Sequence, residues 1–523
     1  MGKLSVSIFY AYFLSYSLGF VLVHASEKIS SCAQTPHPRV CKHFLDLLQS
    51  KDETTPFSFR NQSILSSLNQ AIEAHKKLSI SMNTKSLDKK SKLALTDCLE
   101  LYQDSIDLLN RSLISSNPTD SQTWLSAVIA NQQTCENGFI DFKIGHRLKS
   151  FSFMTNFSKL ISNSLAVNKD SGPFHARKIG GRRLLGFGGF PWWVSGGDRR
   201  LIETDARKGD MVVAQDGSGD YKTITEAVSA MGGKRKRSGR FVIYVKKGVY
   251  KENVEIKKSI TNLMFIGDGI DATIVTANRN VNDGSTTFRS ATFAVGGEGF
   301  IAKDMTFENT AGPEKHQAVA LRSNSDKSVF YRCSFKGYQD TLYVNNNRQF
   351  YRNCDIYGTI DFIFGDARVI LQSCNIYVRK PMSNQKNTVT AQGRKDTNEN
   401  TGIIIQNSIV TAASDLRPVQ GSIKTYLGRP WQKYSRTVIM KTNLDKIIQP
   451  AGWFPWKGNF ALSTLFYGEY MNTGSGAGTR GRVKWPGYHV ITKASDAAMF
   501  TVGNILDGGS WIRAGGVPVN FGL

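Results

Sequence analysis

The feature that most constrains this sequence is an internal repeat at an offset of 21 residues, from position 332 to position 353. Arg332–Val344 (RCSFKGYQDTLYV) realigns on Asn353–Gly365 (NCDIYGTIDFIFG), with Cys on Cys, Gly on Gly and Asp on Asp. A period near 20 is typical of one coil of a parallel β-solenoid, in which equivalent positions of successive coils lie about 4.8 Å apart. The repeat therefore predicts that Asp340 stacks on Asp361.

Two carboxylates held this close constrain the chemistry of the region around them. Because like charges repel, the pair must share a proton or a cation must neutralise one member. The alternative is that both residues are loop-capping aspartates in turn sequences, and the repeat alone leaves it open. Other motifs in the chain are needed to distinguish a functional aspartate pair from two loop-capping aspartates.

The length of 523 residues is too great for one hydrophobic core and predicts two domains plus removable segments. Residues 1–25 combine Lys3 with an apolar run and a small-residue end at Ala25, a pattern typical of a secretory signal peptide. A membrane anchor is the weaker alternative, because several polar residues interrupt the run. We expect an exported mature chain that does not associate with a membrane.

The seven cysteines fit an oxidising compartment, where disulfides persist. Spacing leaves their connectivity open, but pairs Cys32–Cys41 and Cys98–Cys135 would each staple local structure. Cys333, Cys354 and Cys374 follow the repeat, and only two of them can pair; we assign a disulfide to Cys354 and Cys374. Since no C-x-x-C motif occurs, we expect no metal, and nothing in the chain indicates a cofactor.

Charge and glycosylation signals are distributed unevenly along the chain. Residues 205–523 hold 42 Lys and Arg against 26 Asp and Glu, an excess of 16 positive charges. A secreted basic domain favours an acidic polysaccharide partner over nucleic acid. Glycosylation sequons begin at Asn61, Asn110 and Asn156, so we expect carbohydrate only on the first domain.

The first domain, residues 26–170, has the pattern of a four-helix-type bundle, with few glycines and with Leu and Ile at spacings of three and four. Residues 171–204 form a glycine-rich basic segment. It contains two paired-arginine motifs, Arg182–Arg183 and Arg199–Arg200, which a processing protease could recognise. A basic linker without cleavage is the alternative.

Residues 205–523 change to short β-branched runs separated by Gly, Asn and Asp, and no long amphipathic helix interrupts them. Examples are Phe241–Val245, Thr273–Thr276 and Gly402–Val410. Together with the repeat, this pattern favours an all-β domain folded as a right-handed parallel β-helix. Its loops should carry the function.

Five ordered motifs of this region resemble the plant pectin methylesterases (pectinesterases). They are GVYKE at 248–252, QAVALR at 317–322, GYQDTLY at 337–343, GTIDFIFG at 358–365 and YLGRPW at 426–431. The helical domain is similar to the invertase and pectin methylesterase inhibitors through the cysteine motifs and DCLELY at 97–102. The resemblance covers nearly the whole mature chain.

The resemblance implies hydrolysis of methyl esters in homogalacturonan, in the plant cell wall, by a pair of aspartates. Asp361 matches the nucleophile, and Asp340 matches the proton donor that then acts as a base. Arg429 matches the cation that holds Asp361 ionised and binds substrate. Gln317 and Gln339 match the residues that stabilise the transition state.

Substrate contacts are also implied. Thr287 and Trp431 match family positions that bind substrate, as does Gln317, while Tyr343 and Trp453 are candidate aromatic platforms for sugar rings. For these aromatic residues ordinary packing is the alternative. The second basic motif ends in Ile202 instead of Leu, which leaves open which site a subtilisin-like protease would cut.

The sequence disfavours other hydrolase and lyase chemistries. A Ser-His-Asp hydrolase is disfavoured because residues 205–523 contain only His316 and His489 and no G-x-S-x-G motif. Polygalacturonases and pectate lyases would share the fold and an acidic substrate, but the paired glutamines favour ester chemistry. The helical domain is expected to inhibit the enzyme or assist folding until the linker is cut, and a separate proteinaceous inhibitor is a candidate partner.

Overall fold

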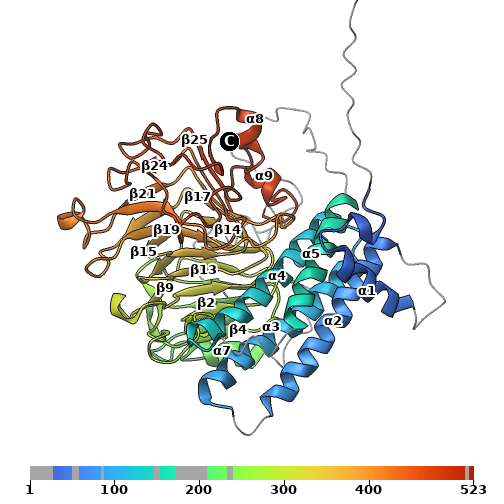
Figure 1. The fold of residues 1–523 in the computed structure, drawn as a ribbon. Coiled ribbons are helices and arrows are strands. Elements are labelled where there is room, and N and C mark those ends of the chain that lie inside the picture. Colours follow the sequence, from blue (N-terminus) through green and yellow to red (C-terminus); the bar gives the residue numbers. More distant parts are fainter. Residues whose placement is uncertain are drawn as a thin grey trace, which may run out of the picture.

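The structure is a computed structural model that describes residues 28–49, 58–83, 87–145, 153–171, 209–231, 239–512 and 517–523. It shows a helical domain lying beside a domain of stacked parallel strands (Figure 1). The expected signal peptide and the four arginines of the expected processing sites lie outside the described residues. Within the described part, no helix has the length and apolar character needed to cross a bilayer.

The helical domain begins with a short 3₁₀ turn and continues as long helices with polar caps. Its elements are η1 (Cys32–Gln34), α1 (Pro38–Gln49), α2 (Phe59–Met82), α3 (Lys89–Ile114), α4 (Pro118–Asp141) and α5 (Phe153–Ser171). The side chains of Ser58, Asp88 and Asn117 accept backbone N–H bonds at the starts of α2, α3 and α4. The sequons Asn61, Asn110 and Asn156 lie on α2, α3 and α5.

Helix α4 is buried along its length, with an unbroken run of buried residues from Ser121 to Cys135. A surface helix would show a polar face. Here one side packs on the other helices and the opposite side on the β domain, where Trp124 Nε1 donates to Asp326 Oδ2 at 3.0 Å. This helix therefore forms the centre of the contact between the two domains.

Both predicted disulfides of the helical domain are confirmed. Cys32 pairs with Cys41 and joins η1 to α1, with a Cα–Cα distance of 5.4 Å. Cys98 pairs with Cys135 and joins α3 to α4, with a Cα–Cα distance of 4.6 Å.

The β domain is a parallel β-helix, as predicted. Within the described residues its strands form three parallel sheets of eleven, eight and seven strands. The eleven-stranded sheet comprises β1 (Met211–Val213), β2 (Phe241–Val245), β5 (Leu263–Ile266), β8 (Ile301–Lys303), β11 (Ser328–Tyr331), β14 (Arg348–Arg352), β17 (Arg368–Gln372), β20 (Gly402–Gln406), β23 (Arg436–Met440), β25 (Phe466–Tyr470) and β26 (Tyr488–Val490).

The other two sheets complete each coil. The eight-stranded sheet comprises β3 (Gly248–Lys251), β6 (Thr273–Ala277), β9 (Thr306–Asn309), β12 (Ser334–Lys336), β15 (Asp355–Gly358), β18 (Asn375–Val378), β21 (Ile409–Ala412) and β24 (Asn443–Leu444). The seven-stranded sheet comprises β4 (Val254–Ile256), β7 (Phe293–Val295), β10 (Leu321–Ser323), β13 (Leu342–Val344), β16 (Ile363–Gly365), β19 (Asn387–Gln392) and β22 (Thr425–Gly428).

Short helical elements occur around the β-helix. They are α7 (Ile224–Ala230), η4 (Phe288–Ser290), η5 (Pro313–Lys315), η6 (Arg417–Val419), α8 (Ala494–Ala498) and α9 (Val502–Ile505). Ile224 and Ala227 of α7 pack into the β-helix core. The residues of α8 and α9, and the chain end around Val517, pack on the outer side of the eleven-stranded sheet.

Two-residue turns connect the eleven-stranded sheet to the eight-stranded sheet in successive coils. The first turn residue has a positive φ, for example 50° at Arg332, 51° at Asn353 and 54° at Ser373. The run Gly402–Val410, expected as one strand, is therefore two strands: Asn407, with φ 51°, turns the chain between β20 and β21. A β-branched run does not reveal such a turn, because the corner takes only two residues.

The predicted Cys354–Cys374 disulfide is wrong in this structure, where Cys333, Cys354 and Cys374 are buried free thiols. The parallel register stacks all three in neighbouring coils, since Ser334 pairs with Asp355 and Asp355 with Asn375. Each sulfur lies against backbone carbonyls: Cys354 Sγ donates to the Phe330 oxygen at 3.4 Å and Cys374 Sγ to the Gln372 oxygen at 3.5 Å.

The prediction that Trp453 is a sugar platform is also wrong, because this side chain is 1% exposed inside the β-helix core. Its ring stacks on Tyr467 with a centroid distance of 4.1 Å, and its Nε1 donates to Glu469 Oε1 at 3.2 Å. Trp453 therefore stabilises the core of the β-helix and has no exposed ring surface on which a sugar could stack.

Replacing Trp453 by alanine should lower the free energy of unfolding by about 3–5 kcal/mol, because it leaves a large cavity and removes one of the hydrogen-bond donors to Glu469. Urea unfolding of the purified protein measures the change. An exposed tryptophan, Trp456, offers the comparison: Trp456→Ala should cost about 1 kcal/mol or less. Equal losses for the two variants would contradict the packing role.

Candidate active site

Asp340 and Asp361 occupy equivalent positions on neighbouring coils. Strands β13 and β16 pair in parallel with Leu342 opposite Ile363, and each aspartate lies two residues before these positions. The Asp340 amide donates to the Ile360 carbonyl at 3.0 Å, which ties the two loops together. Both aspartates have positive φ angles, 62° and 50°, a conformation that is uncommon outside glycine and is found at functional sites.

Arg429, directly after β22, forms a two-pronged ion pair with Asp361. Its Nε lies 2.9 Å from Asp361 Oδ1, and its Nη2 lies 2.6 Å from Oδ2. Thr388 of β19 adds a hydroxyl that donates to Oδ1 at 2.7 Å. The plane of the Asp361 carboxylate is therefore fixed by three donors.

Asp340 lies in a different environment, although it faces the same site. Its side chain is buried, and burial is the main reason why its pKa is raised well above the ordinary value. The charges of Asp361 and Asp141 raise it further, and Arg429 acts in the opposite direction. The pair thus consists of one ion-paired carboxylate and one carboxyl group whose protonated form is favoured.

The two predicted glutamines flank the aspartates. Gln339 precedes Asp340, and its carbonyl accepts a hydrogen bond at 3.2 Å from the amide of Ala318, the residue after Gln317. The two glutamines therefore lie in adjacent coils. Both side chains are half-buried.

Aromatic side chains continue the site along the outer side of the seven-stranded sheet. Tyr343 and Phe364 are opposite each other in the register of β13 and β16 and stack with a centroid distance of 4.2 Å. Trp431 meets Phe364 edge to face at 5.9 Å. Of the predicted aromatic residues, Tyr343 and Trp431 are thus placed beside the aspartates.

Three further residues of the site were not predicted: Phe364, Thr388 and Trp456. Trp456 stacks on the Arg429 guanidinium at 4.4 Å from the ring centroid. The repeat could have found Phe364, which is 21 positions after Tyr343. Thr388 had no such signal, because the segment between β18 and β19 lengthens its coil to 27 residues after Asp361.

The helical domain covers this side of the β-helix. We call the outer side of the seven-stranded sheet, with the adjoining Phe288, the covered face; Phe288, Tyr343 and Phe364 share one apolar cluster with the helices. The hydroxyls of Thr134 and Tyr343 are 3.1 Å apart. The Thr287 amide donates to Asp141 Oδ2 at 2.8 Å, and Thr287 is thus occupied by the end of α4.

Asp141 extends the acidic cluster of the site from the helical domain. Burial raises the pKa of Asp141 to about 6, although the hydrogen bonds from Thr287 lower it. Asp340 and Asp361 are only 8% and 6% exposed in the presence of the helices. The aspartate pair is therefore shielded from solvent in this form of the protein.

Two family models match the chain. One, described as pectinesterase, matches residues 210–509, and the other, described as plant invertase/pectin methylesterase inhibitor, matches residues 29–167. "Probable pectinesterase/pectinesterase inhibitor 6" of Arabidopsis thaliana is 56% identical over 529 residues, covering 95% of this chain and 94% of that protein. "Pectinesterase 2" of Citrus sinensis is 50% identical over 517 residues, covering 96% and 98%.

A solved structure supports the same relationship. The pectin methylesterase from carrot matches with a TM-score of 0.60 and 58% identity, over 61% of this chain and all of that one. The fold and the matches together define a carboxylic ester hydrolase of the β-helix type. The chain belongs to the pectinesterase family, with an inhibitor-like helical domain ahead of the enzyme domain.

The raised pKa of Asp340 predicts how stability depends on pH. Between the unfolded pKa, about 3.9, and the higher folded pKa, the native state holds a proton that the unfolded state has released. Stability therefore falls as pH rises through this window. Asp340→Asn removes this effect and should increase the free energy of unfolding at pH 7 by about 1 kcal/mol or more, with no gain below about pH 4.

Urea unfolding between pH 3 and pH 8 checks this expectation. Asp46→Asn, an exposed substitution on α1, is the matched control and should follow the wild-type profile. A destabilised Asp340→Asn variant at pH 7 would contradict the assignment of a protonated carboxyl group.

Proposed function

We propose that this chain hydrolyses the methyl esters of galacturonate residues in homogalacturonan and releases methanol by way of an acyl-enzyme on Asp361. The observation that carries the proposal is the unequal aspartate pair: Arg429 forms an ion pair with Asp361, while Asp340 is buried and has no ion-pair partner among the described residues. Such a pair provides a nucleophile and a proton donor side by side.

The reaction divides into two steps. Asp361 attacks the C6 carbonyl carbon, the bond to the methoxy oxygen breaks, and Asp340 gives its proton to the leaving methoxide. Asp340, now a carboxylate, then takes a proton from water, which attacks the acyl group and releases Asp361 and the free galacturonate. Amide groups of Gln317 and Gln339 stabilise the oxyanion in both steps, each by roughly 3 kcal/mol.

The substrate class follows from charge and from the covered face. The β-domain segment has 42 basic against 26 acidic residues, which attracts a polyanion. Tyr343, Phe364 and Trp431 offer ring surfaces on which the apolar faces of sugars stack. The carrot relative is named a pectin methylesterase, in agreement with this assignment.

Asp361→Asn should lower methanol release from methylated pectin by about 10³-fold or more, because an amide neither attacks the carbonyl nor pairs with Arg429. Methanol is assayed directly, and circular dichroism checks that the fold is kept. Asp355→Asn, on the eight-stranded sheet, is the matched control and should retain wild-type activity. Shortened or unsaturated oligogalacturonides without methanol would reject ester hydrolysis in favour of a glycosidase or a lyase.

The helical domain supports a second part of the proposal, regulation by processing. Thr287 and Tyr343, which should bind substrate, are hydrogen-bonded to Asp141 and Thr134 of α4. We infer that residues 26–170 are a pro-domain that blocks the site until a subtilisin-like protease cuts the 171–204 segment. The chain would be secreted to the cell wall, with glycans at the three sequons, and a separate inhibitor protein would compete for the covered face.

Replacing Arg182, Arg183, Arg199 and Arg200 by glutamine should yield an uncut secreted chain with less than about a tenth of the methanol release of the cut protein. The physical reason is that substrate and helices compete for one surface. Insertion of an unrelated protease site into the same segment provides the control, since cutting there should restore activity. Full activity of the uncut chain would refute inhibition by the helical domain.

A further inference from the structure

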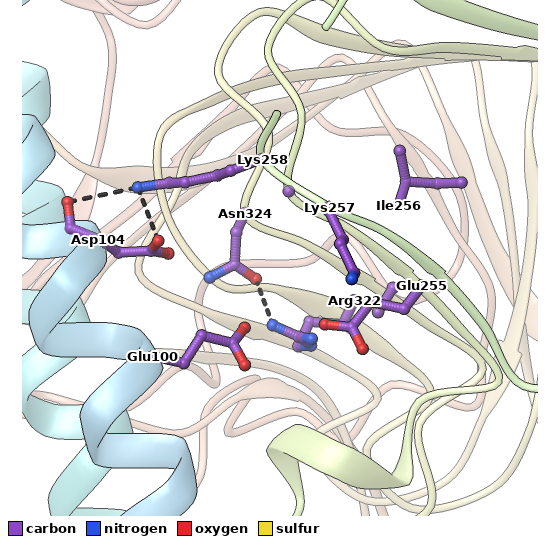
Figure 2. A pocket seen from close by; sticks show the side chains of 10 residues that line it. Glu100, Asp104, Glu255, Ile256, Lys257, Lys258, Arg322 and Asn324 are labelled. Carbon is purple, nitrogen blue, oxygen red and sulfur yellow. Dashed lines mark hydrogen bonds and ion pairs between the residues drawn. The ribbon is translucent and has the colours of Figure 1, made fainter. Parts of the chain in front are cut away.

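Arg379 directly follows β18 and forms hydrogen bonds to several neighbouring coils of the β-helix. The charged residues at the edge of the seven-stranded sheet are placed differently. There a cavity of about 230 Å³ separates α3 from the sheet, and Lys258 reaches across it to Asp104 at 2.9 Å (Figure 2). Arg322 lines the same cavity. Those residues belong to the contact between the domains, whereas Arg379 bonds to the two turns that carry the aspartates of the site.

The strand register explains how one residue reaches both turns. Gly358 lies opposite Val378, so Thr359 and Arg379 occupy equivalent positions in neighbouring coils. The Thr359 amide donates to the Tyr338 carbonyl at 2.9 Å, which places Tyr338 one coil earlier in the same column. The guanidinium of Arg379 therefore reaches back past the level of Thr359 to a residue two coils away.

The side chain of Arg379 holds the earlier turn, which carries Gln339 and Asp340. Its Nη1 donates to the Gly337 carbonyl at 3.1 Å, and its Nη2 donates to the Tyr338 hydroxyl at 2.6 Å. Its Cζ lies 3.8 Å from the centroid of the Tyr338 ring. Because all three contacts come from one planar guanidinium, they fix the orientation of the turn as well as its position.

The backbone of Arg379 holds the later turn, which carries Asp361. Its amide donates to the Gly358 carbonyl at 2.8 Å, and its carbonyl accepts a hydrogen bond from Asn387 Nδ2 at 3.2 Å. Asn387 is the first residue of β19, which also provides Thr388, the hydroxyl donor to Asp361. Arg379 thus connects the turns of both aspartates with the strand that orients the second one.

The earlier turn depends on a side chain because its strand is shorter. β12 ends at Lys336, whereas β15 continues to Gly358, the equivalent of Gly337. The Gly358 carbonyl is bound by a backbone amide of the next coil, and the Gly337 carbonyl is bound by a guanidinium. A positive φ such as that of Asp340 persists only where the surrounding structure holds it.

Asp415 orients the guanidinium from the other side. Its Oδ2 lies 3.3 Å from Arg379 Nε, so each of the three guanidinium nitrogens has an acceptor. The Arg379 side chain is 26% exposed, and its removal therefore leaves the packing of the β-helix core intact.

We propose that Arg379 is a positioning residue that holds the earlier turn so that Asp340 and Gln339 face the ester bound at Asp361. This rests on the proposed function, in which Asp340 protonates the leaving methoxide. Without the guanidinium, the earlier turn loses two hydrogen bonds while the later turn keeps its backbone bond. The proton donor then moves relative to the nucleophile, and a misplacement of about 1 Å costs about 10²-fold in rate.

The first test measures kcat and KM for methanol release from methylated oligogalacturonates, in whichever form of the protein, cut or uncut, works fastest. Arg379→Gln should lower kcat about 10²-fold and change KM less than about threefold, because the substrate contacts are kept. Arg379→Lys retains a donor for the Gly337 carbonyl but lacks the planar fork, so it should recover part of the lost kcat.

Arg332 offers a matched control. It also bonds to the preceding coil, with Nε 2.6 Å from Asp304 Oδ1, and its Cζ lies 5.0 Å from the Tyr331 ring centroid. It precedes β12, whereas the aspartate turn follows that strand. Arg332→Gln should therefore keep the wild-type kcat, and circular dichroism checks the fold of each variant. A kcat loss as large as that of Arg379→Gln would overturn the inference.

A third variant serves if Arg379→Gln does not fold. Asp415→Asn removes the charge that orients Arg379 and leaves the bonds to the earlier turn in place. It should lower kcat in the same direction by a smaller factor, with KM again unchanged. A wild-type kcat for this variant, when Arg379→Gln is unfolded, would overturn the inference.

A second measurement asks whether the effect passes through Asp340. A trifluoroethyl ester of the same oligogalacturonate releases an alkoxide that needs less help from a proton donor than methoxide does. Arg379→Gln should therefore reduce kcat/KM about tenfold less on the trifluoroethyl ester than on the methyl ester. Equal losses on the two esters would overturn the inference and leave the proposed function standing. Absence of methanol with the wild-type protein would overturn both.

Discussion

The parallel register between β13 and β16 is the constraint on which the candidate site depends. It places Leu342 opposite Ile363 and, two residues earlier, Asp340 opposite Asp361. Strand pairing thus forces together two carboxyl groups that would separate in a less rigid structure. Arg429 and Thr388 belong to later coils and bind Asp361 but not Asp340. Because backbone hydrogen bonds hold these coils in place, they also maintain the different surroundings of the two aspartates.

The contact between the two domains shows charge complementarity. Most of the described ion pairs across it join an acid of the helical domain to a base of the β-helix, such as Asp97 to Arg289, Asp104 to Lys258 and Glu136 to Lys395. Charge complementarity of this kind fixes orientation and partner choice more than affinity. The same basic surface suits an acidic polysaccharide, which explains how one face can serve the helices and the proposed substrate in turn.

Much of the fold and of the site could be predicted from local patterns. The repeat gave the coil length and the aspartate pair, and the motif YLGRPW pointed to Arg429. Trp453 shows where this reasoning stops, since an aromatic residue beside a site can point inward and the sequence carries no sign of direction. Thr388 shows another limit, because an insertion hides its place in the period. The three stacked cysteines show a third limit. Adjacent thiols need not form a disulfide when each donates a hydrogen bond to a backbone carbonyl.

The sequence by itself determined the class of fold, because the 21-residue period and short β-branched runs leave few alternatives to stacked coils. It also determined the chemistry available, since the aspartates, glutamines and arginine occur in one ordered set of motifs. Only the tertiary structure decided that α4 covers the aspartates, that Asp141 reaches Thr287, and that α3 meets Arg322 across a cavity. These contacts join residues more than 140 positions apart in sequence, and the packing of whole domains, not local propensity, sets them.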